Sequence, residues 1–285
     1  MRIGVVSAGA MGSAIGRVLR QGGAEVVTTV AGRSERTTRL AEEAGLECLP
    51  DLDAVVASAD VVLSIAPPGE AEEIAGEIGA AAPRGSSRPL VADLNAVSPD
   101  TTRRIEAALA KRGLDLVDGS ISGPPPRAAG STRIYLSGSR AQEVAGLPFS
   151  GVRLIQVGVE VGTASAVKMC TASVYKGSVA ILAHAVLTAV ENGVLDHVLD
   201  DLAELADGAG RSIARSATKS ARYVAEMREI AATQAAAGLT PALFEAMAEV
   251  YSALSRRPLA QVSPESIGAD VELADVLRNL APDAR

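Results

Sequence analysis

The chain has 285 residues, 48% of them hydrophobic and 21% charged, so it can bury a substantial core and is expected to form two domains. Its 27 basic and 34 acidic side chains give a net charge of −7, which argues against nonspecific attraction to nucleic acid or to an anionic membrane. Two cysteines and two histidines are too few for a disulfide framework or a metal-ligand pattern.

The N-terminus, MRIGVVSAGAMG, lacks the long apolar region of a signal peptide. The most apolar helical stretch, SVAILAHAVLTAV, is too short to cross a bilayer by itself. We therefore expect a cytoplasmic protein that acts on a small molecule, with no nucleic-acid or membrane partner.

Strand-like apolar runs alternate with helical patterns through the first half of the chain. The runs are IGVVS, EVVTTVA, VVLSIAP, LVADLN and LDLVDGS, with TRIYLSGS and GVRLIQVG following them. This alternation predicts an α/β domain of Rossmann type, with a mostly parallel, doubly wound sheet, over residues 1–160. Residues 163–192 are nearly free of helix breakers, so we expect one long helix and then an all-helical domain over residues 161–285.

The first strand is followed by a glycine-containing turn and a helix. Ser7, Gly9 and Gly12 approximate the Gly-x-Gly-x-x-Gly pattern of dinucleotide-binding turns, with serine in the first position. In that pattern the second glycine lets a pyrophosphate approach, the third allows close packing, and the helix N-terminus offers N–H groups. We expect Gly9, Ala10, Met11 and Gly12 to hold the pyrophosphate. Ser7 is small enough for the turn if its φ is negative, but it weakens the match to the pattern. The alternative is a glycine turn that binds nothing.

The segment VAGRSERTTR stands where an NAD enzyme usually offers a carboxylate to the adenosine ribose. Arg33, Ser34 and Arg36 instead supply two positive charges and a hydroxyl, which suit a 2′-phosphate. The segment therefore predicts NADP(H) as the cofactor. The alternative is that these side chains form a solvated helix start.

Five motifs follow one another in a recognisable order: IGVVSAGAMG, SIAPP, DLNAVSP, DGSISG with GSTRIYLSG, and VGTASAVKM. Together they resemble the β-hydroxyacid dehydrogenase superfamily, which includes 3-hydroxyisobutyrate dehydrogenase, 6-phosphogluconate dehydrogenase and the imine reductases. The resemblance implies that Ala66 and Pro67 lie in a loop under the cofactor and that Asn95 lies near the nicotinamide. It also implies that Ser122 and Gly123 bind a substrate carboxylate, and that the helical domain forms a homodimer.

Lys168 is, by the same resemblance, the general acid/base. The chemistry agrees, since a lysine that loses hydration at a domain junction can exchange a proton with a substrate oxygen while the nicotinamide exchanges a hydride. The alternative is a bystander lysine whose ammonium group extends to solvent.

The chain departs from the family pattern at several positions. Ala172 replaces the Asn that binds substrate, and Tyr175 replaces the Glu that assists proton transfer in 6-phosphogluconate dehydrogenase. Because Thr171 and Tyr175 share a helix face with Lys168, we expect Thr171 to bind substrate and Tyr175 to act in catalysis, although Tyr175 as a packing residue is an equal alternative. Three prolines follow Gly123, so the substrate pocket is expected to differ. Arg127 is a candidate for pairing with an anionic group, and the alternative is an exposed loop arginine.

The sequence thus predicts an NADPH-dependent oxidoreductase that interconverts a carbonyl and a hydroxyl on a small, carboxylate-bearing substrate. An imine reductase is the alternative within enzymes. A noncatalytic NADP(H)-binding regulatory protein is the alternative outside them, favoured by Ala172 and by serine at position 7.

Overall fold

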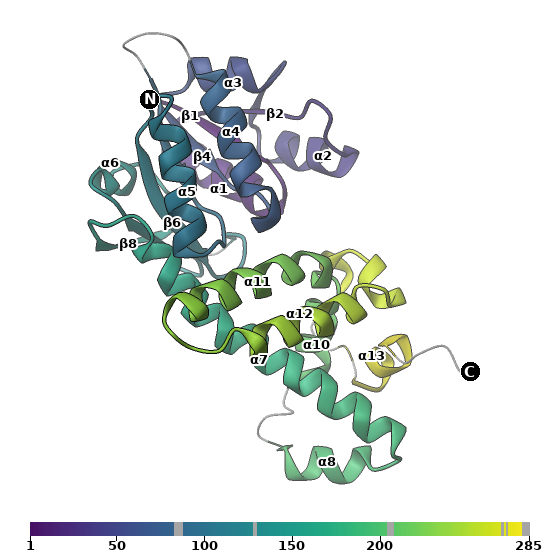
Figure 1. Ribbon diagram of the computed structural model, residues 1–285. Coiled ribbons are helices and arrows are strands. Elements are labelled where there is room, and N and C mark those ends of the chain that lie inside the picture. Colours follow the sequence, from purple (N-terminus) through teal and green to yellow (C-terminus); the bar gives the residue numbers. More distant parts are fainter. Residues whose placement is uncertain (83–87, 128–129, 204–207, 269–270, 272, 281–285) are drawn as a thin grey trace. The chain divides into compact units, whose positions relative to one another are not determined.

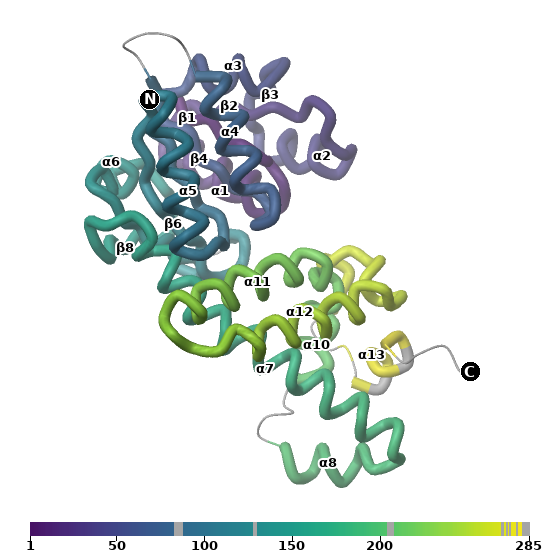
Figure 2. Tube along the Cα trace, viewed as in Figure 1, coloured from purple at the N-terminus to yellow at the C-terminus, as the bar shows by residue number. Residues whose placement is uncertain are grey.

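The computed structural model describes residues 1–82, 88–127, 130–203, 208–268, 271 and 273–280. These residues form two compact units, Met1–Met169 and Cys170–Arg285, which are treated separately below. Figures 1 and 2 follow the chain through both units, from the purple N-terminus to the yellow C-terminal helix.

The first unit is built on one eight-stranded sheet with the strand order β3-β2-β1-β4-β5-β6-β7-β8. All neighbouring strands are parallel except β6 and β7, which confirms the predicted mostly parallel sheet. The short β3 was not expected, because three residues carry no strand periodicity. The strands are β1 (Arg2–Val6), β2 (Glu25–Thr29), β3 (Glu47–Leu49), β4 (Val61–Ser64), β5 (Leu90–Asp93), β6 (Leu116–Ser122), β7 (Arg133–Ser137) and β8 (Arg153–Gly158).

Helices cover both faces of this sheet. One apolar cluster packs the first face against α1 (Ala10–Gln21), α2 (Glu35–Glu43) and α6 (Ala141–Ala145). A second cluster packs the other face against α3 (Leu52–Ser58), α4 (Ala71–Ala81) and α5 (Pro99–Ala110), and Figure 1 shows α4 and α5 side by side. On β1, Ile3 and Val5 belong to the first cluster and Val6 to the second, as the two-residue period of a strand requires.

Because β1, β2, β4, β5 and β6 are parallel, their carboxyl ends meet at one edge of the sheet. The strand order reverses between β1 and β4. The turn after β1 and the loop after β4, which contains η1 (Pro68–Glu70), both leave from this edge. A switch point of this kind is where doubly wound sheets bind ligands. The fold therefore brings motifs that are far apart in sequence to a single edge.

Helix α7 (Thr163–Glu191) is one continuous helix, as the sequence predicted for residues 163–192. Its first turns belong to the first unit and the remainder to the second. The boundary expected from the sequence, at residue 160, lies between the end of β8 at Gly158 and the start of α7. By length and composition α7 is apolar enough to cross a membrane, with a mean hydropathy of 1.4 and 28% of the window buried. The apolar stretch judged too short in the sequence is thus part of a longer helix. Both of its lysines bond within the protein, Lys168 to a backbone carbonyl and Lys176 to Glu226.

The second unit contains helices joined by loops and no strand among its described residues, as predicted. Helices α11 and α12 pack together through Tyr223 and Tyr251, whose rings meet edge to face with centroids 5.3 Å apart. The Tyr251 hydroxyl donates to the Lys176 carbonyl at 2.8 Å, which ties α12 to α7. The elements after α7 are α8 (Leu195–Asp201), α10 (Ala209–Ala217), α11 (Ser220–Ala236), α12 (Ala242–Leu254), η2 (Pro258–Gln261), η3 (Pro264–Ser266) and α13 (Leu273–Leu280).

Candidate functional site

The turn after β1 holds Ser7 in the left-handed region, with a φ of +69°. The sequence analysis had made the fit of Ser7 depend on a negative φ, and that condition is not met. Directly after Ser7 the chain turns sharply, and the Gly9 N–H donates back to the Ser7 carbonyl at 2.8 Å. An L-residue pays about 1–2 kcal/mol for the left-handed conformation, which explains why the usual residue there is glycine.

Gly9 and Gly12 are glycines for different reasons. A β-carbon on residue 12 would collide with the Ser7 carbonyl oxygen, so Gly12 allows α1 to pack against β1. A β-carbon on residue 9 would meet no protein atom within 4 Å, and the φ of Gly9 is an ordinary −68°. The protein itself thus does not require glycine at position 9. The open space over Gly9 fits the close approach of a pyrophosphate to the backbone.

The N-terminus of α1 faces the same open space. Gly9 is its N-cap residue and supplies no side-chain cap, and the first turn holds no acidic residue. The backbone N–H groups of Ala10, Met11 and Gly12 lie in this first turn, where an α-helix leaves its N–H groups without intrahelical acceptors. A diphosphate would supply acceptors and a favourable charge for the helix dipole. The predicted cradle therefore fits the cofactor in backbone geometry.

The segment expected to bind the adenosine phosphate begins α2, immediately after β2. Ser34 is the N-cap residue, and its hydroxyl oxygen accepts a hydrogen bond from the Thr37 N–H at 3.3 Å. The side chains of Arg33 and Arg36 are exposed on either side of it. The helix start that was weighed as an alternative is thus real, and the arginines beside it are accessible to a phosphate. Their role in binding NADP(H) stays a prediction.

Asn95 connects the end of β5 with the loop after β4. Its side-chain oxygen accepts from the Ala66 N–H at 2.6 Å, and its side-chain nitrogen donates to the Ser64 hydroxyl at 3.0 Å. The same nitrogen donates to Asp93, as does the Asn95 backbone N–H at 3.1 Å. Asn95 is only 2% exposed, whereas Ala66 and Pro67 are half-buried. Buried Asn95 therefore holds the predicted cofactor loop through the Ala66 N–H. Its sequence motif did not specify this role.

Asp93 is buried at the end of β5, with 3% of its surface exposed. Burial, together with the negative charge of Asp118 on the neighbouring strand, raises the pKa of its carboxyl group to about 7, against the lowering effect of the hydrogen bonds from Asn95. The two aspartates occupy matching positions in β5 and β6. Asp93 therefore changes its charge close to neutral pH.

Asp118 anchors the start of α7. Its carboxylate accepts hydrogen bonds from the Ser137 hydroxyl, the Gly162 N–H, the Ser165 N–H and the Ser165 hydroxyl, at 2.7 to 3.1 Å. In addition, the Ser120 hydroxyl donates to the Ala164 carbonyl at 2.8 Å. A carboxylate at a helix N-terminus is favourable because it satisfies N–H groups and complements the helix dipole. The first turn of α7 is therefore held firmly against β6 and β7.

Lys168 lies one turn after Ser165 on this anchored segment. Its ammonium nitrogen is 2.8 Å from the carbonyl oxygen of Ile121, and the side chain is half-buried. Ile121 immediately precedes Ser122, the last residue of β6. The ammonium group therefore lies at the carboxyl edge of the sheet, next to the predicted substrate segment and not out in solvent.

Gly123 follows β6 with a φ of +111°, and a β-carbon there would collide with the Ser131 carbonyl oxygen. The position therefore requires glycine. The prolines that follow are held by their carbonyl groups, because the Thr132 hydroxyl donates to Pro124 at 2.7 Å and the Arg17 guanidinium donates to Pro126 at 2.9 Å.

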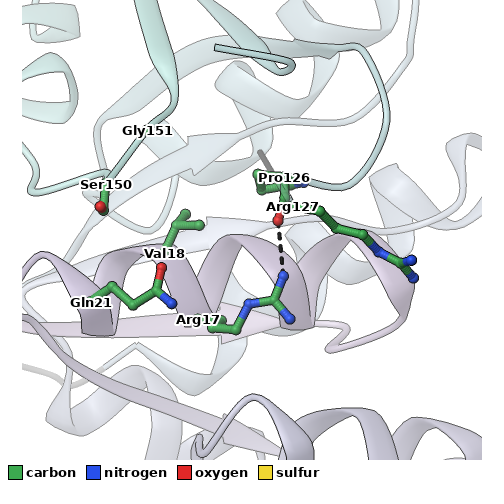
Figure 3. Close-up of a pocket in the computed structure, with 7 residues that line it drawn as sticks. All are labelled: Arg17, Val18, Gln21, Pro126, Arg127, Ser150 and Gly151. Atoms are coloured by element: carbon green, nitrogen blue, oxygen red, sulfur yellow. Dashed lines mark hydrogen bonds between the residues drawn. The ribbon is translucent and has the colours of Figure 1, made fainter. Parts of the chain in front are cut away.

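Arg127 lies beside α1 after this proline segment. Figure 3 shows it lining a cavity of about 550 Å³ with Arg17, Gln21 and Ser150. Arg17 is two turns into α1, so the cavity is on the flank of that helix. The structure thus places Arg127 beside α1. The sequence analysis had instead considered this arginine as a partner for a substrate anion.

Thr171 and Tyr175 lie on α7 beyond the first unit. Because α7 is continuous, both keep the helical spacing from Lys168 on which their prediction was based. The Tyr175 side chain is 76% exposed in the chain by itself, so it is not a packing residue of its own unit. Ala172, in contrast, is buried. The assignments of Thr171 to substrate and of Tyr175 to catalysis stay predictions.

Sequence reasoning missed three polar residues of this edge: Asp93, Asp118 and Ser165. All three stand in motifs that had been noticed, DLNAVSP, DGSISG and VGTASAVKM, but their burial was not recognised. For the two aspartates, a carboxylate within an otherwise apolar strand is the signal that could have found them, since a buried carboxylate needs donors nearby.

Two family models match the chain. The NAD-binding domain of 6-phosphogluconate dehydrogenase matches residues 2–147, about half of the chain. A domain of unknown function, DUF1932, matches residues 189–254 in the helical unit.

Relatives of both known and unknown function match the chain. An uncharacterized 28.5 kDa protein of Methanothermus fervidus is 30% identical over 72% of this chain and 77% of its own. The 3-hydroxyisobutyrate dehydrogenase of Pseudomonas aeruginosa is 29% identical over 53% of this chain and 52% of its own. Among solved structures, a conserved hypothetical protein from Sinorhizobium meliloti is 28% identical, covers 98% of this chain and 96% of its own, and has a TM-score of 0.66.

Proposed function

Because the chain belongs to the 6-phosphogluconate and 3-hydroxyisobutyrate dehydrogenase-like family of the β-hydroxyacid dehydrogenase superfamily, we propose that it is an NADPH-dependent oxidoreductase. It interconverts a carbonyl and a hydroxyl group on a small substrate that carries a carboxylate. The NAD(P)-binding fold is shared with known dehydrogenases, and the chemistry proposed here rests on the residues of the edge described above.

The observation that carries the proposal is the position of Lys168. Its ammonium group is held 2.8 Å from the Ile121 carbonyl, at the residue before Ser122, on a helix start that Asp118 anchors. A bystander lysine would extend its ammonium group to water, whereas this one is directed to the carboxyl edge of the sheet. This position supports a role for the ammonium group in proton transfer to a substrate bound at Ser122 and Gly123.

In the direction of reduction, Lys168 donates a proton to the carbonyl oxygen as that oxygen gains negative charge, and solvent then returns the proton to the lysine. The bound cofactor supplies the hydride for the carbonyl carbon. In the direction of oxidation, neutral Lys168 accepts the proton of the hydroxyl group. Ser122 and the Gly123 backbone orient the carboxylate, and Thr171 and Tyr175 complete the substrate contacts.

NADP(H) is the proposed cofactor form. Gly9 and the first turn of α1 bind the pyrophosphate, and Asn95 with Ala66 and Pro67 supports the nicotinamide end. The exposed Arg33 and Arg36 beside Ser34 favour a 2′-phosphate over the two ribose hydroxyls of NAD(H). Replacing both arginines by Ala should raise the KM for NADPH by at least tenfold and leave the KM for NADH nearly unchanged. Equal effects on both cofactors would contradict this assignment.

A homodimer in the cytoplasm is the proposed state of the protein. Val174 and Ile181 lie on one side of α7 and expose 65% and 61% of their surfaces, which supports coverage of this helix by a second copy. The acidic balance of the chain is consistent with a soluble enzyme that has neither nucleic-acid nor membrane partners.

The direct test is NADPH consumption with a panel of β-keto acids, aldehydes and cyclic imines. Turnover of β-keto acids or aldehydes supports the proposal. Turnover of cyclic imines alone would make the protein an imine reductase, an alternative that Tyr175 favours and the retained Lys168 opposes. Tight NADPH binding with no turnover on the whole panel would support the noncatalytic regulatory protein.

A further inference from the structure

A buried carboxylate stands behind the predicted cofactor loop and takes no part in the proton transfer proposed above. We propose that Asp93 is a positioning residue, which fixes the side-chain amide of Asn95 and through it the Ala66 backbone for the nicotinamide cofactor. This inference rests on the proposed function, because it concerns the same cofactor site.

The geometry defines one orientation of the Asn95 amide. Its nitrogen donates to Asp93 and to the Ser64 hydroxyl, and its oxygen accepts from the Ala66 N–H at 2.6 Å. Rotation of the amide by a half turn would place the oxygen against the Asp93 carboxylate and the NH2 group against the Ala66 N–H. Both new contacts would be repulsive. Asp93 therefore selects the orientation in which Asn95 holds the loop after β4.

The bond from Asn95 to Asp93 depends on the charge of Asp93. A hydrogen bond to an ionised carboxylate is roughly twice as strong as one to a neutral acceptor. Protonation of Asp93 leaves an acceptor of the same shape but without the charge, so it loosens Asn95 without displacing it. The coupling from Asp93 to the loop is consequently strongest at high pH.

The surroundings of Asp93 leave its charge largely uncompensated. Among the described residues, one of its carboxylate oxygens, Oδ2, is buried and has no hydrogen-bond partner. The charged group that faces it from β6 is Asp118, which is of the same sign, and β4 contributes only the Ser64 hydroxyl.

Cations on the neighbouring helices do not compensate Asp93 either. On α5, Arg103 pairs with Asp100 and Arg104 pairs with Glu72, both at the exposed surface. On α7, Lys168 donates to the Ile121 carbonyl. These surroundings explain why the pKa of Asp93 is raised to about 7, so that its charge changes within the range of a binding experiment.

The test compares the wild type with Asp93→Asn, in which a neutral amide has the shape of the protonated acid. Dissociation constants for NADP⁺ and for NADPH are measured by fluorescence titration between about pH 6 and pH 8.5. The 2′-phosphate of the cofactor also titrates in this range, but it affects both proteins equally. For each form of the cofactor, the dissociation constant of the variant divided by that of the wild type therefore isolates the effect of Asp93.

We expect this ratio to be close to 1 at pH 6 and to rise to about five- to tenfold at pH 8.5, with its midpoint near pH 7 and the same size for NADP⁺ and NADPH. Ser64→Ala is the matched control. It removes the other acceptor of the same Asn95 nitrogen but no charge, so its ratio should not change with pH. If Asp93→Asn does not fold, Asn95→Ser replaces it, because loss of the amide should produce the same rise.

A ratio that is constant over this pH range would overturn the inference, as would an effect confined to NADP⁺, which would indicate a field acting on the charged ring and not a positioned loop. Either result leaves the proposed function intact. Failure of the wild type to bind NADP⁺ or NADPH at every pH would overturn the inference and the proposed function together.

Discussion

The carbonyl oxygen of Ser7 occupies the space that a β-carbon on residue 12 would need. Strand β1 and helix α1 therefore approach as closely as a glycine at position 12 permits. The same turn stores strain at position 7, where serine adopts a left-handed conformation, and leaves open space at position 9. These three positions can be distinguished by experiment, because substitutions at positions 7 and 12 should change stability in opposite directions and a substitution at position 9 should change cofactor affinity.

Ser7→Gly should stabilise the folded protein. Glycine relieves about 1–2 kcal/mol of left-handed strain and adds about 0.5–1 kcal/mol of chain entropy to the unfolded state, so we expect a net gain of about 0.5–1 kcal/mol. Urea unfolding of the two proteins measures the difference. Ser7→Ala is the control, since it removes the hydroxyl and keeps the strain, and a gain of the same size from Ala would contradict the explanation.

Gly9→Ala should lower cofactor affinity, whereas Gly12→Ala should lower the stability of the folded protein. At position 9 the methyl group meets no protein atom, so stability should change by less than about 1 kcal/mol while NADPH affinity falls at least tenfold. At position 12 the methyl group meets backbone, so the protein should lose about 1–3 kcal/mol of stability. Thermal unfolding and NADPH titration distinguish the two. If Gly9→Ala binds NADPH as the wild type does, the pyrophosphate does not lie over Gly9.

Lys168→Arg should remove turnover without removing the positive charge. Arginine can still donate to the Ile121 carbonyl, but it does not lose a proton at any accessible pH. We expect kcat to fall by about 10²–10⁴-fold, with NADPH affinity and unfolding midpoint close to those of the wild type. Lys111→Met on the surface of α5 controls for loss of a lysine. Retention of more than a tenth of the wild-type kcat in Lys168→Arg would exclude Lys168 as the acid/base.

The buried Asp93 should make stability depend on pH. Its folded pKa of about 7 lies above the ordinary 3.8, so the folded state binds the proton more tightly than the unfolded state between these values. Its contribution is therefore greatest below about pH 4 and is lost as the pH rises to about 7, at on the order of 1 kcal/mol per pH unit. Urea unfolding at several pH values should show Asp93→Asn gaining on the wild type up to about pH 7 and then holding a constant lead. Parallel curves for the two proteins would contradict the shift.

The exposed side of α7 should be the dimer contact. Ile181→Glu places a charge among apolar side chains of this face, so we expect a wild-type dimer and a monomeric variant in light scattering after size-exclusion chromatography. Thr38→Glu on α2 serves as the control and should leave the dimer intact. A wild type that is monomeric at micromolar concentration would remove the proposal.

Much of the fold could be predicted because its signals are local. The alternation of apolar runs with helical patterns indicated the mostly parallel sheet, and the absence of helix breakers over residues 163–192 predicted α7 almost to its ends. The short β3 gave no such signal, since three residues form a strand only when a neighbouring strand offers its backbone.

The candidate site divides in the same way. The glycines were identified by their spacing, and Lys168 and Asn95 by motifs whose order along the chain resembles that of a known family. The partners of these residues were not predictable, because Ser165 bonds to Asp118 and Ala66 bonds to Asn95 across long stretches of sequence. No local pattern records such a contact.

By itself, the sequence determined the α/β and helical order of the chain, the glycine turn, and the identity of the lysine at the start of α7, since these depend on residue types at short spacing. Only the tertiary structure decided that Ser7 has a left-handed backbone conformation and that Asp118 anchors α7 so that Lys168 reaches Ile121. It also decided that Asp93 is buried, which raises the pKa of its carboxyl group to about 7. The physical reason is that backbone strain, donor geometry and desolvation depend on which strands lie side by side, and the folded sheet alone establishes that.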